Sequence, residues 1–109
     1  MKLSIYSNIS DKKLVALYKE KEHTDIIGEL YKRYTKFVFL VSMKYLKDEE
    51  SSKDASMQIF EKLITDLLNH SVDNFKSWLY MVTRNHCLMM LRKDQSNLRN
   101  KQEYKKDNE

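Results

Sequence analysis

Three side chains in the last third of the sequence, Lys76, Tyr80 and Arg84, have the types and the spacing of a nucleic-acid contact. They recur every fourth residue, and residues four apart on a helix share a face. Lysine and arginine neutralise phosphates, and an aromatic face stacks on an unpaired base with about 1 to 3 kcal/mol per base. Arg92 and Lys93 extend the basic character further along the chain. A face that holds an unpaired strand more tightly than duplex would shift DNA toward the open state.

Asn85 adds a directional group beside these cations. Its amide offers a donor and an acceptor, which suits the edge of a base in a way that a lysine does not. Two plainer interpretations stay open. Lys76 and Arg84 could form an ordinary solvated face, and Asn85 could bond a backbone carbonyl inside the protein.

Other kinds of chemistry find little support in the sequence. His23, His70 and His86 are not at metal-ligand spacing, and Cys87 is the single cysteine, so we predict no metal site and no intramolecular disulfide. With one glycine, the chain has no glycine-rich phosphate loop and no nucleophile elbow, and it shows no paired-carboxylate constellation. We therefore expect no cofactor and no enzymatic activity.

Composition predicts an all-α fold, a bundle of about four helices. The 109 residues suffice for one domain, and the absence of proline together with a single glycine, Gly28, leaves little turn chemistry for strands. The net charge of +4 is compatible with a polyanionic partner but does not require one. A lone cysteine, no signal-peptide pattern and no long apolar segment favour a cytoplasmic protein.

The first half of the sequence shows two helical patterns. Ser10 and Asp11 can cap a short first helix, whose apolar face contains Leu14, Leu17 and Tyr18. A second helix is predicted to begin near Thr24 and to hold its spacing for some six turns. Its apolar positions are Ile27, Leu30, Tyr31, Tyr34, Val38, Val41 and Tyr45.

A polar stretch, 47–52, interrupts this pattern and predicts the start of a third helix. Asp48, Glu49 and Glu50 place negative charge where a helix exposes its unpaired amide groups. The apolar spacing fades at Asn69, and a loop is predicted to follow. The positions expected in the core are Ala55, Ile59, Phe60, Leu63, Ile64 and Leu67.

A fourth helix is predicted after the loop, with Asp73 or Asn74 as its cap. Its apolar surface is wider than one core contact needs, so part of it is expected to face a partner. Beyond Arg92 the sequence is polar and lysine-rich, which predicts frayed helix or linker. The broad face contains Phe75, Trp78, Leu79, Val82, His86 and Met89, and we expect Phe75 and Trp78 to shape a site more than to stack on DNA.

Four segments in order, DKKLVALYKE, ELYKRYTKFVFLVSMKYLKDEESSKDASMQIFEKL, NFKSWLYMVTRN and HCLMMLRK, resemble the second conserved region of extracytoplasmic-function sigma factors, over Asp11 to Lys93. The most specific piece is the pattern F-x-x-W-L-Y-x-x-x-R-N, which starts at Phe75 and ends at Asn85. It is preceded at the expected distance by Asp54, Ala55 and Phe60. The sequence looks most like the members from Bacteroidetes.

The resemblance implies two interfaces. The loop from Asn69 to Asn74 would surround an extruded base of the non-template strand of the minus-ten promoter element, and the fourth helix would hold that strand. The implied DNA-binding residues are Asn69, His70, Ser71, Asp73, Asn74, Lys76, Tyr80, Arg84, Asn85, Arg92 and Lys93. The exposed face of the third helix would bind the clamp helices of the polymerase beta-prime subunit through a polar surface formed by Asp54, Met57, Gln58, Glu61 and Lys62.

The sequence departs from the family pattern in two respects. Many members read D-A-x-Q-E-x-F in the third helix, whereas here Met57 and Gln58 occupy the Q-E positions. Full-length members also carry a helix-turn-helix domain that reads the minus-thirty-five element, and the residues after Lys93 are too few for one. We therefore predict a helical domain over 1–93, and a polar tail over 94–109 that begins a linker to a second domain outside this chain.

The resemblance thus predicts a module that binds core RNA polymerase and recognises and melts the minus-ten element. An anti-sigma factor is a further partner that it leaves open. The competing hypothesis is a helical interaction or adaptor domain that buries the wide face of the fourth helix against another protein.

Overall fold

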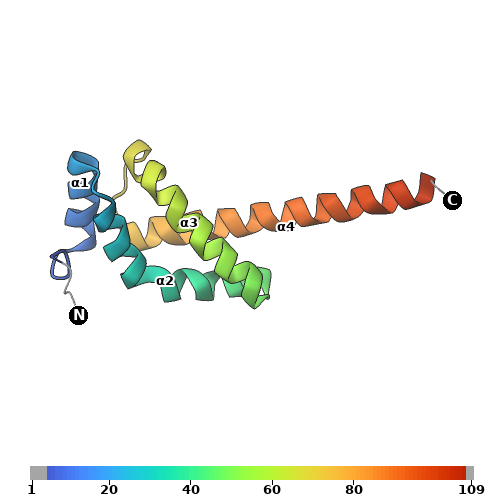
Figure 1. The fold of residues 1–109 in the computed structure, drawn as a ribbon, viewed down its shortest axis with the longest axis horizontal. Helices are drawn as coiled ribbons and strands as arrows, with labels where there is room; N and C mark the ends of the chain where they lie inside the picture. Colours follow the sequence, from blue (N-terminus) through green and yellow to red (C-terminus); the bar gives the residue numbers. More distant parts are fainter. Residues whose placement is uncertain (1–4, 108–109) are drawn as a thin grey trace.

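The computed structural model describes the backbone of residues 5–107 and the side chains of residues 5–95. This part of the chain has no strand and forms four helices (Figure 1): α1 Asp11–Lys21, α2 Thr24–Leu46, α3 Glu49–Asn69 and α4 Phe75–Asp107. The predicted all-α fold is confirmed. No helix in the described part combines the length and the apolar character that crossing a membrane requires.

The predicted starts of α1, α3 and α4 are confirmed by side-chain caps, and α2 begins at Thr24 as predicted but without one. The side chains of Ser10 and Asp48 accept hydrogen bonds from the backbone amides of Lys13 (3.3 Å) and Ser51 (2.8 Å). Each bond satisfies an amide that has no partner within its own helix. Of the two predicted caps for α4, the structure selects Asn74, whose side-chain oxygen accepts from the amide of Ser77 (3.0 Å).

α1 and α2 end without glycine. Glu22 (φ 53°) and Lys47 (φ 56°) adopt the left-handed conformation that usually favours glycine at this position. Each cap amide bonds a carbonyl four residues back, at Tyr18 and Met43 respectively. The left-handed conformation costs roughly 1 to 2 kcal/mol per non-glycine residue, which the carbonyl bonds and the surrounding packing must offset.

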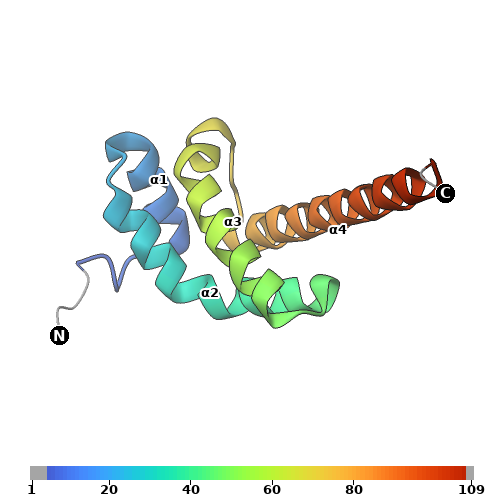
Figure 2. The ribbon, with the colours of Figure 1, turned by 45° about the vertical axis from the view of Figure 1, so that its right-hand side comes forward.

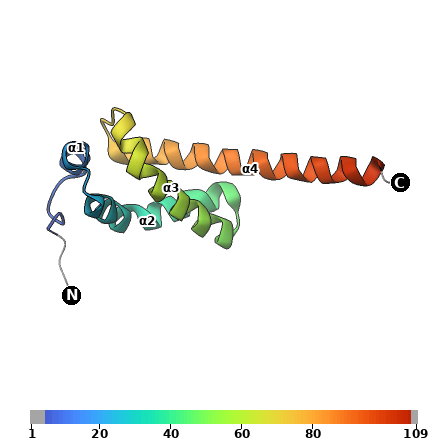
Figure 3. The same cartoon turned by 45° about the horizontal axis from the view of Figure 1, so that its top comes forward.

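α2 is the central element, because it contacts the three other helices, most extensively α3 and α4. α3 packs against both α2 and α4, while α1 covers the end of the bundle opposite to that from which α4 projects (Figures 1, 2 and 3). α4 continues as helix well past Lys93, where the sequence predicted frayed helix or linker. The division of the chain at Lys93 into a domain and a tail stays a prediction.

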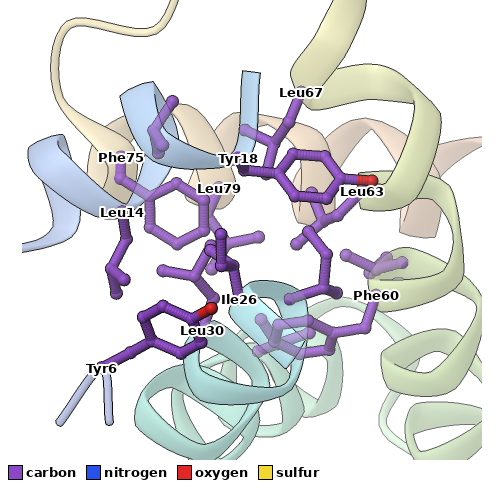
Figure 4. Close-up of a cluster of buried hydrophobic side chains, with 14 of the residues drawn as sticks. Tyr6, Leu14, Tyr18, Ile26, Leu30, Phe60, Leu63, Leu67, Phe75 and Leu79 are labelled. Carbon is purple, nitrogen blue, oxygen red and sulfur yellow. The ribbon is translucent and has the colours of Figure 1, made fainter. Parts of the chain in front are cut away.

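One hydrophobic core joins all four helices (Figure 4). Tyr18 from α1 reaches across the core, and its hydroxyl donates to the carbonyl of Ile64 in α3 (2.6 Å). Burial raises the pKa of this hydroxyl, and the nearby Glu22 adds to the effect. Among the most buried core residues are Leu14, Ile26, Leu30, Ile59, Leu63, Leu67 and Leu79.

The apolar stripes are wider than the core that they build. Ile64 is 39% exposed, although the spacing predicted it in the core, and Met89, on the broad apolar face of α4, is 52% exposed. Ile64 follows the fully buried Leu63 and so lies at the edge of the contact face of α3. Met89 lies on the wall of a groove between α3 and α4. Periodicity predicts which face of a helix is apolar, whereas the position of the neighbouring helix determines how much of that face is buried.

A network around Arg33 connects α1, α2 and the segment before α1. The Arg33 guanidinium bonds Asp11 (2.9 Å) and Glu29 (2.8 Å), and donates to the backbone carbonyls of Tyr6 and Ser7. Tyr34 also donates to Asp11. The Glu29 side chain is almost fully buried, and Arg33 is the cation that pairs with it.

Replacing Arg33 by methionine is expected to lower the free energy of unfolding by about 3 kcal/mol, because it leaves the Glu29 carboxylate buried without its cation. The double substitution Glu29→Met and Arg33→Met should recover most of this loss. Urea unfolding measures both effects. As a control, Lys53→Met removes an exposed partner of Glu49 and should change stability by less than about 1 kcal/mol. A double variant as unstable as Arg33→Met would contradict this account.

Candidate nucleic-acid interface

A groove of about 440 Å³ lies between α3 and α4. It brings together His70, at the end of α3, and Asn85, in the middle of α4, which the sequence assigned to the same DNA interface. Trp78 forms an aromatic part of the wall. The lining residues are Lys62, Asp66, His70, Trp78, Met81, Val82, Asn85, His86 and Met89.

His86 lines this groove from a buried position. Its Nε2 lies 2.9 Å from Oε1 of Gln58. With that carbonyl oxygen as the acceptor, Nε2 carries the proton and Nδ1 is left as an acceptor, for which the described residues provide no partner. Burial, with a contribution from the Lys62 cation, lowers the pKa of His86 below its ordinary value of 6.5. The groove therefore contains a neutral imidazole at neutral pH.

The loop between α3 and α4 is held at several points. Lys19 of α1 donates to the carbonyl of His70, and His70 Nδ1 donates to the carbonyl of Asp66 (2.8 Å). Asn69 donates to the carbonyl of Thr65 (3.1 Å). Asn74 in addition caps α4. Several polar side chains that were expected to bind a base therefore form hydrogen bonds that stabilise the loop.

The side chains of Ser71 and Asp73 are the exposed polar groups that remain at the loop. His70 contributes one ring face as well, with its centroid 6.2 Å from that of Trp78. Trp78 lies 6.1 Å from Phe75, which is 4% exposed. Phe75 is thus a core residue, whereas the half-buried Trp78 forms part of the groove wall.

Lys76, Tyr80 and Arg84 lie on the side of α4 that faces α2. Lys76 and Tyr80 line a shallow hollow of about 360 Å³ together with Phe37 of α2. The Lys76 ammonium lies 5.3 Å from the centre of the Phe37 ring. The Tyr80 hydroxyl lies 3.1 Å from the hydroxyl of Tyr45, also of α2.

The predicted DNA-binding residues therefore lie on both sides of α4. Arg84 connects the two sides, because its Nη1 donates to Oδ1 of Asn85 (3.3 Å). Asn85 is exposed and lines the groove, so it does not bond a backbone carbonyl inside the bundle, the plainer alternative for this residue. Arg92 and Lys93 are exposed further along α4.

The residues assigned to polymerase lie on α3. Asp54, Gln58 and Glu61 form an exposed stripe at three- and four-residue spacing. Met57 is 67% exposed and borders an apolar hollow of about 330 Å³ between α3 and α2. Lys62 lines the groove that also contains Asn85, so it lies within reach of either partner. The hollow is lined by Tyr31, Thr35, Lys36, Phe39, Lys53, Ser56 and Met57.

Sequence reasoning missed the residues that other helices bring to these sites. Lys19 holds the loop across a separation of 51 residues, and Tyr45 meets Tyr80 across 35 residues. Phe37 was also missed. A signal existed only for Tyr45, which was expected in the core because it continues the stripe of α2.

No group of three potential metal ligands occurs among the described histidine, cysteine, aspartate and glutamate side chains. Cys87 is buried, and burial raises the pKa of its thiol, an effect partly opposed by a hydrogen bond with Ser42. This thiol contributes to the contact between α4 and α2.

The amino-acid sequence of this region matches a known protein family. Residues 30–97, more than half of the chain, match the family model of sigma-70 region 2. The match begins in α2, contains α3 and extends into α4, so it includes both sides of α4 described above. No curated protein and no solved structure matches the chain.

The lowered pKa of His86 predicts a pH dependence of stability. Between pH 6.5 and the lower pKa of the folded protein, the unfolded chain binds a proton that the folded chain does not, so stability should fall as pH decreases through this window. Urea unfolding at a series of pH values measures the effect, and His86→Gln should remove this component. Replacing the exposed His23 by glutamine is the matched control. An unchanged pH profile in His86→Gln would contradict the assignment.

Proposed function

This chain belongs to the sigma-70 region 2 family, whose members are non-enzymatic domains of RNA polymerase sigma factors, and we propose that it opens and holds the minus-ten promoter element while bound to core polymerase. Family membership implies binding to core polymerase and to promoter DNA. The proposal adds which residues make each contact and how strand separation is favoured.

The observation that carries the proposal is the groove between α3 and α4. It combines the exposed amide of Asn85, the ring of His70 and the wall formed by Trp78 in one concave surface. An amide next to aromatic surface provides both hydrogen bonding to a base edge and a partner for the base face. Such a surface can bind an unpaired base, whereas a base that is paired and stacked inside duplex cannot enter it.

Strand opening then requires no covalent step. A base bound in the groove is unavailable for pairing, so the binding energy favours the open state by the difference in affinity between single strand and duplex. Arg84 adds a phosphate contact next to Asn85, Lys76 adds one on the side of α4 that faces α2, and Arg92 and Lys93 extend the basic surface along α4. Ser71 and Asp73, exposed at the loop, are the proposed contributors to base preference.

Polymerase binding is assigned to the stripe of Asp54, Gln58 and Glu61, with Met57 as its apolar member. Complementary charge at such a surface fixes the orientation of the two proteins, and the exposed methionine would add contact area when the polymerase covers it. Gln58 is the one stripe residue that also reaches the groove, through its bond to His86. Most of the stripe therefore remains available while DNA occupies the groove.

Within the family, we assign the chain to the extracytoplasmic-function group, with its greatest resemblance to members from Bacteroidetes. The pattern from Phe75 to Asn85 supports this assignment, as does the order of the four segments. An adaptor domain that binds only proteins remains the competing function, because Met81 and Met89 are exposed beside the groove.

Asn85→Ala is expected to weaken binding of a short single-stranded oligonucleotide, selected from a random pool for binding to the wild-type chain, by roughly tenfold. Loss of the amide removes hydrogen bonds to the base but leaves the helix intact. A fluorescence titration measures the affinity, and binding should weaken as salt rises. The control is Asn8→Ala, an exposed asparagine before α1. If the chain is an adaptor domain, the selection should give no tightly binding oligonucleotide, or one whose affinity changes neither with salt nor with Asn85→Ala.

Glu61→Lys is expected to weaken binding to core RNA polymerase by roughly tenfold while leaving oligonucleotide affinity nearly unchanged, because it reverses the charge of an exposed residue of the proposed polymerase stripe. Competition against a labelled sigma factor measures this affinity. Glu20→Lys, which makes the same change on the exposed side of α1, is the matched control. Equal effects of the two variants would assign polymerase binding to another face.

A further inference from the structure

We propose that α2 and α4 together form a second nucleotide site, in which a base occupies the hollow beside Phe37 and Tyr80 and its phosphate binds where the hydroxyls of Tyr45 and Tyr80 meet. The inference rests on the proposed function, because the nucleotide belongs to the same single strand that enters the groove on the other side of α4. The contribution of α2 to DNA binding is the new element.

The pair of hydroxyls leaves one O–H group that can donate a hydrogen bond to an anion. The oxygens of Tyr45 and Tyr80 lie 3.1 Å apart, and either can donate to the other. Two hydroxyls hold two protons, and one proton is used between them, so the accepting hydroxyl keeps a proton that it can donate outward. A phosphate oxygen is a suitable acceptor for that proton.

The charges near this pair are positive. The hydrogen bond with Tyr45, together with Lys44 and Arg84, lowers the pKa of Tyr80, although desolvation opposes the shift. Lys44 Nζ also lies 5.7 Å from the centre of the Tyr45 ring. Arg84 uses one N–H on Asn85 and has others free to donate. Two cations and a hydroxyl donor around one point form the complement of a phosphodiester.

The neighbouring hollow has the character needed for a base. Its wall contains the half-buried ring of Phe37, the ring of Tyr80 and the exposed side chain of Met81, with Lys76 at the rim. Aromatic and sulfur-containing walls accept the face of any base, so this site is expected to bind without strong sequence preference. Tyr80 belongs both to the hollow and to the hydroxyl pair, so base and phosphate would bind on adjoining parts of one residue.

The two sites are adjacent on α4. Met81 lines both the hollow and the groove between α3 and α4. A strand that crosses α4 at Met81 would therefore place one base in each, with Arg84 and Asn85 in contact between them. Single-strand binding by stacking and phosphate neutralisation is the mode that these groups support.

The test combines protein variants with changes in the selected oligonucleotide described above. Each linkage in turn is replaced by a neutral methylphosphonate, and affinity is measured for the wild-type chain and for Tyr45→Phe with Lys44→Gln. At one linkage the neutral group should weaken wild-type binding roughly tenfold but weaken binding of the double variant clearly less, because that variant has already lost Lys44 and the Tyr45 hydroxyl as partners of the phosphate. A second comparison removes the base next to that linkage. The abasic position should weaken binding of the wild-type chain but have less effect on Phe37→Leu, which has already lost the ring that contacts the base.

Matched controls exist on the same helix. Lys36 and Phe39 line the hollow between α2 and α3, so Lys36→Gln and Phe39→Leu remove the same groups from a different face. They should leave the scan unchanged, and circular dichroism verifies that every variant is folded. If the effect of the neutral linkage and the effect of the protein variant simply add at every position of the strand, the second site is overturned. The proposed function survives that result as long as Asn85→Ala still weakens binding. Failure of the wild-type chain to bind any selected strand would instead overturn the proposed function.

Discussion

The structure depends on the burial of the apolar face of α2 against α3 and α4 at the same time. Ile26, Leu30 and Val38 have no exposed surface, and they meet Leu63 and Leu79 in one core. Burying large aliphatic side chains of this kind stabilises a fold by about 1.5 to 3 kcal/mol each. Because α2 contacts both partners, it determines their spacing, and the hollows beside α4 are the spaces that this spacing leaves.

Polar contacts then determine what those spaces present to solvent. The loop after α3 is held from α1 through Lys19, so the helix farthest from the groove in the sequence positions one of its edges. The bond between Gln58 and His86 does the same on the opposite wall. Such contacts contribute only about 1 kcal/mol each to stability, but they restrict the conformations available to the groove before any partner arrives.

Local pattern was sufficient for the helices and insufficient for the site. Ser10 and Asn74 cap helices where their types and positions predicted caps, and Asp48 caps the helix whose start its charge predicted, because capping is a contact within one turn. The pairing of Tyr45 with Tyr80 has no such local cause, since it depends on how two helices cross. For the same reason, the sequence placed Lys76 and Asn85 in one interface, whereas the structure divides them between two sides of α4.

Cys87 lies where α4 contacts α2, beside Ser42, and both side chains have no exposed surface. It is the single cysteine of the sequence, so a thiol-reactive reagent has one possible target in the whole chain. That reagent gains access only when α4 separates from α2, since burial both blocks the approach and disfavours the reactive thiolate. The rate of chemical labelling thus reports, without any added probe, how often this helix pair opens.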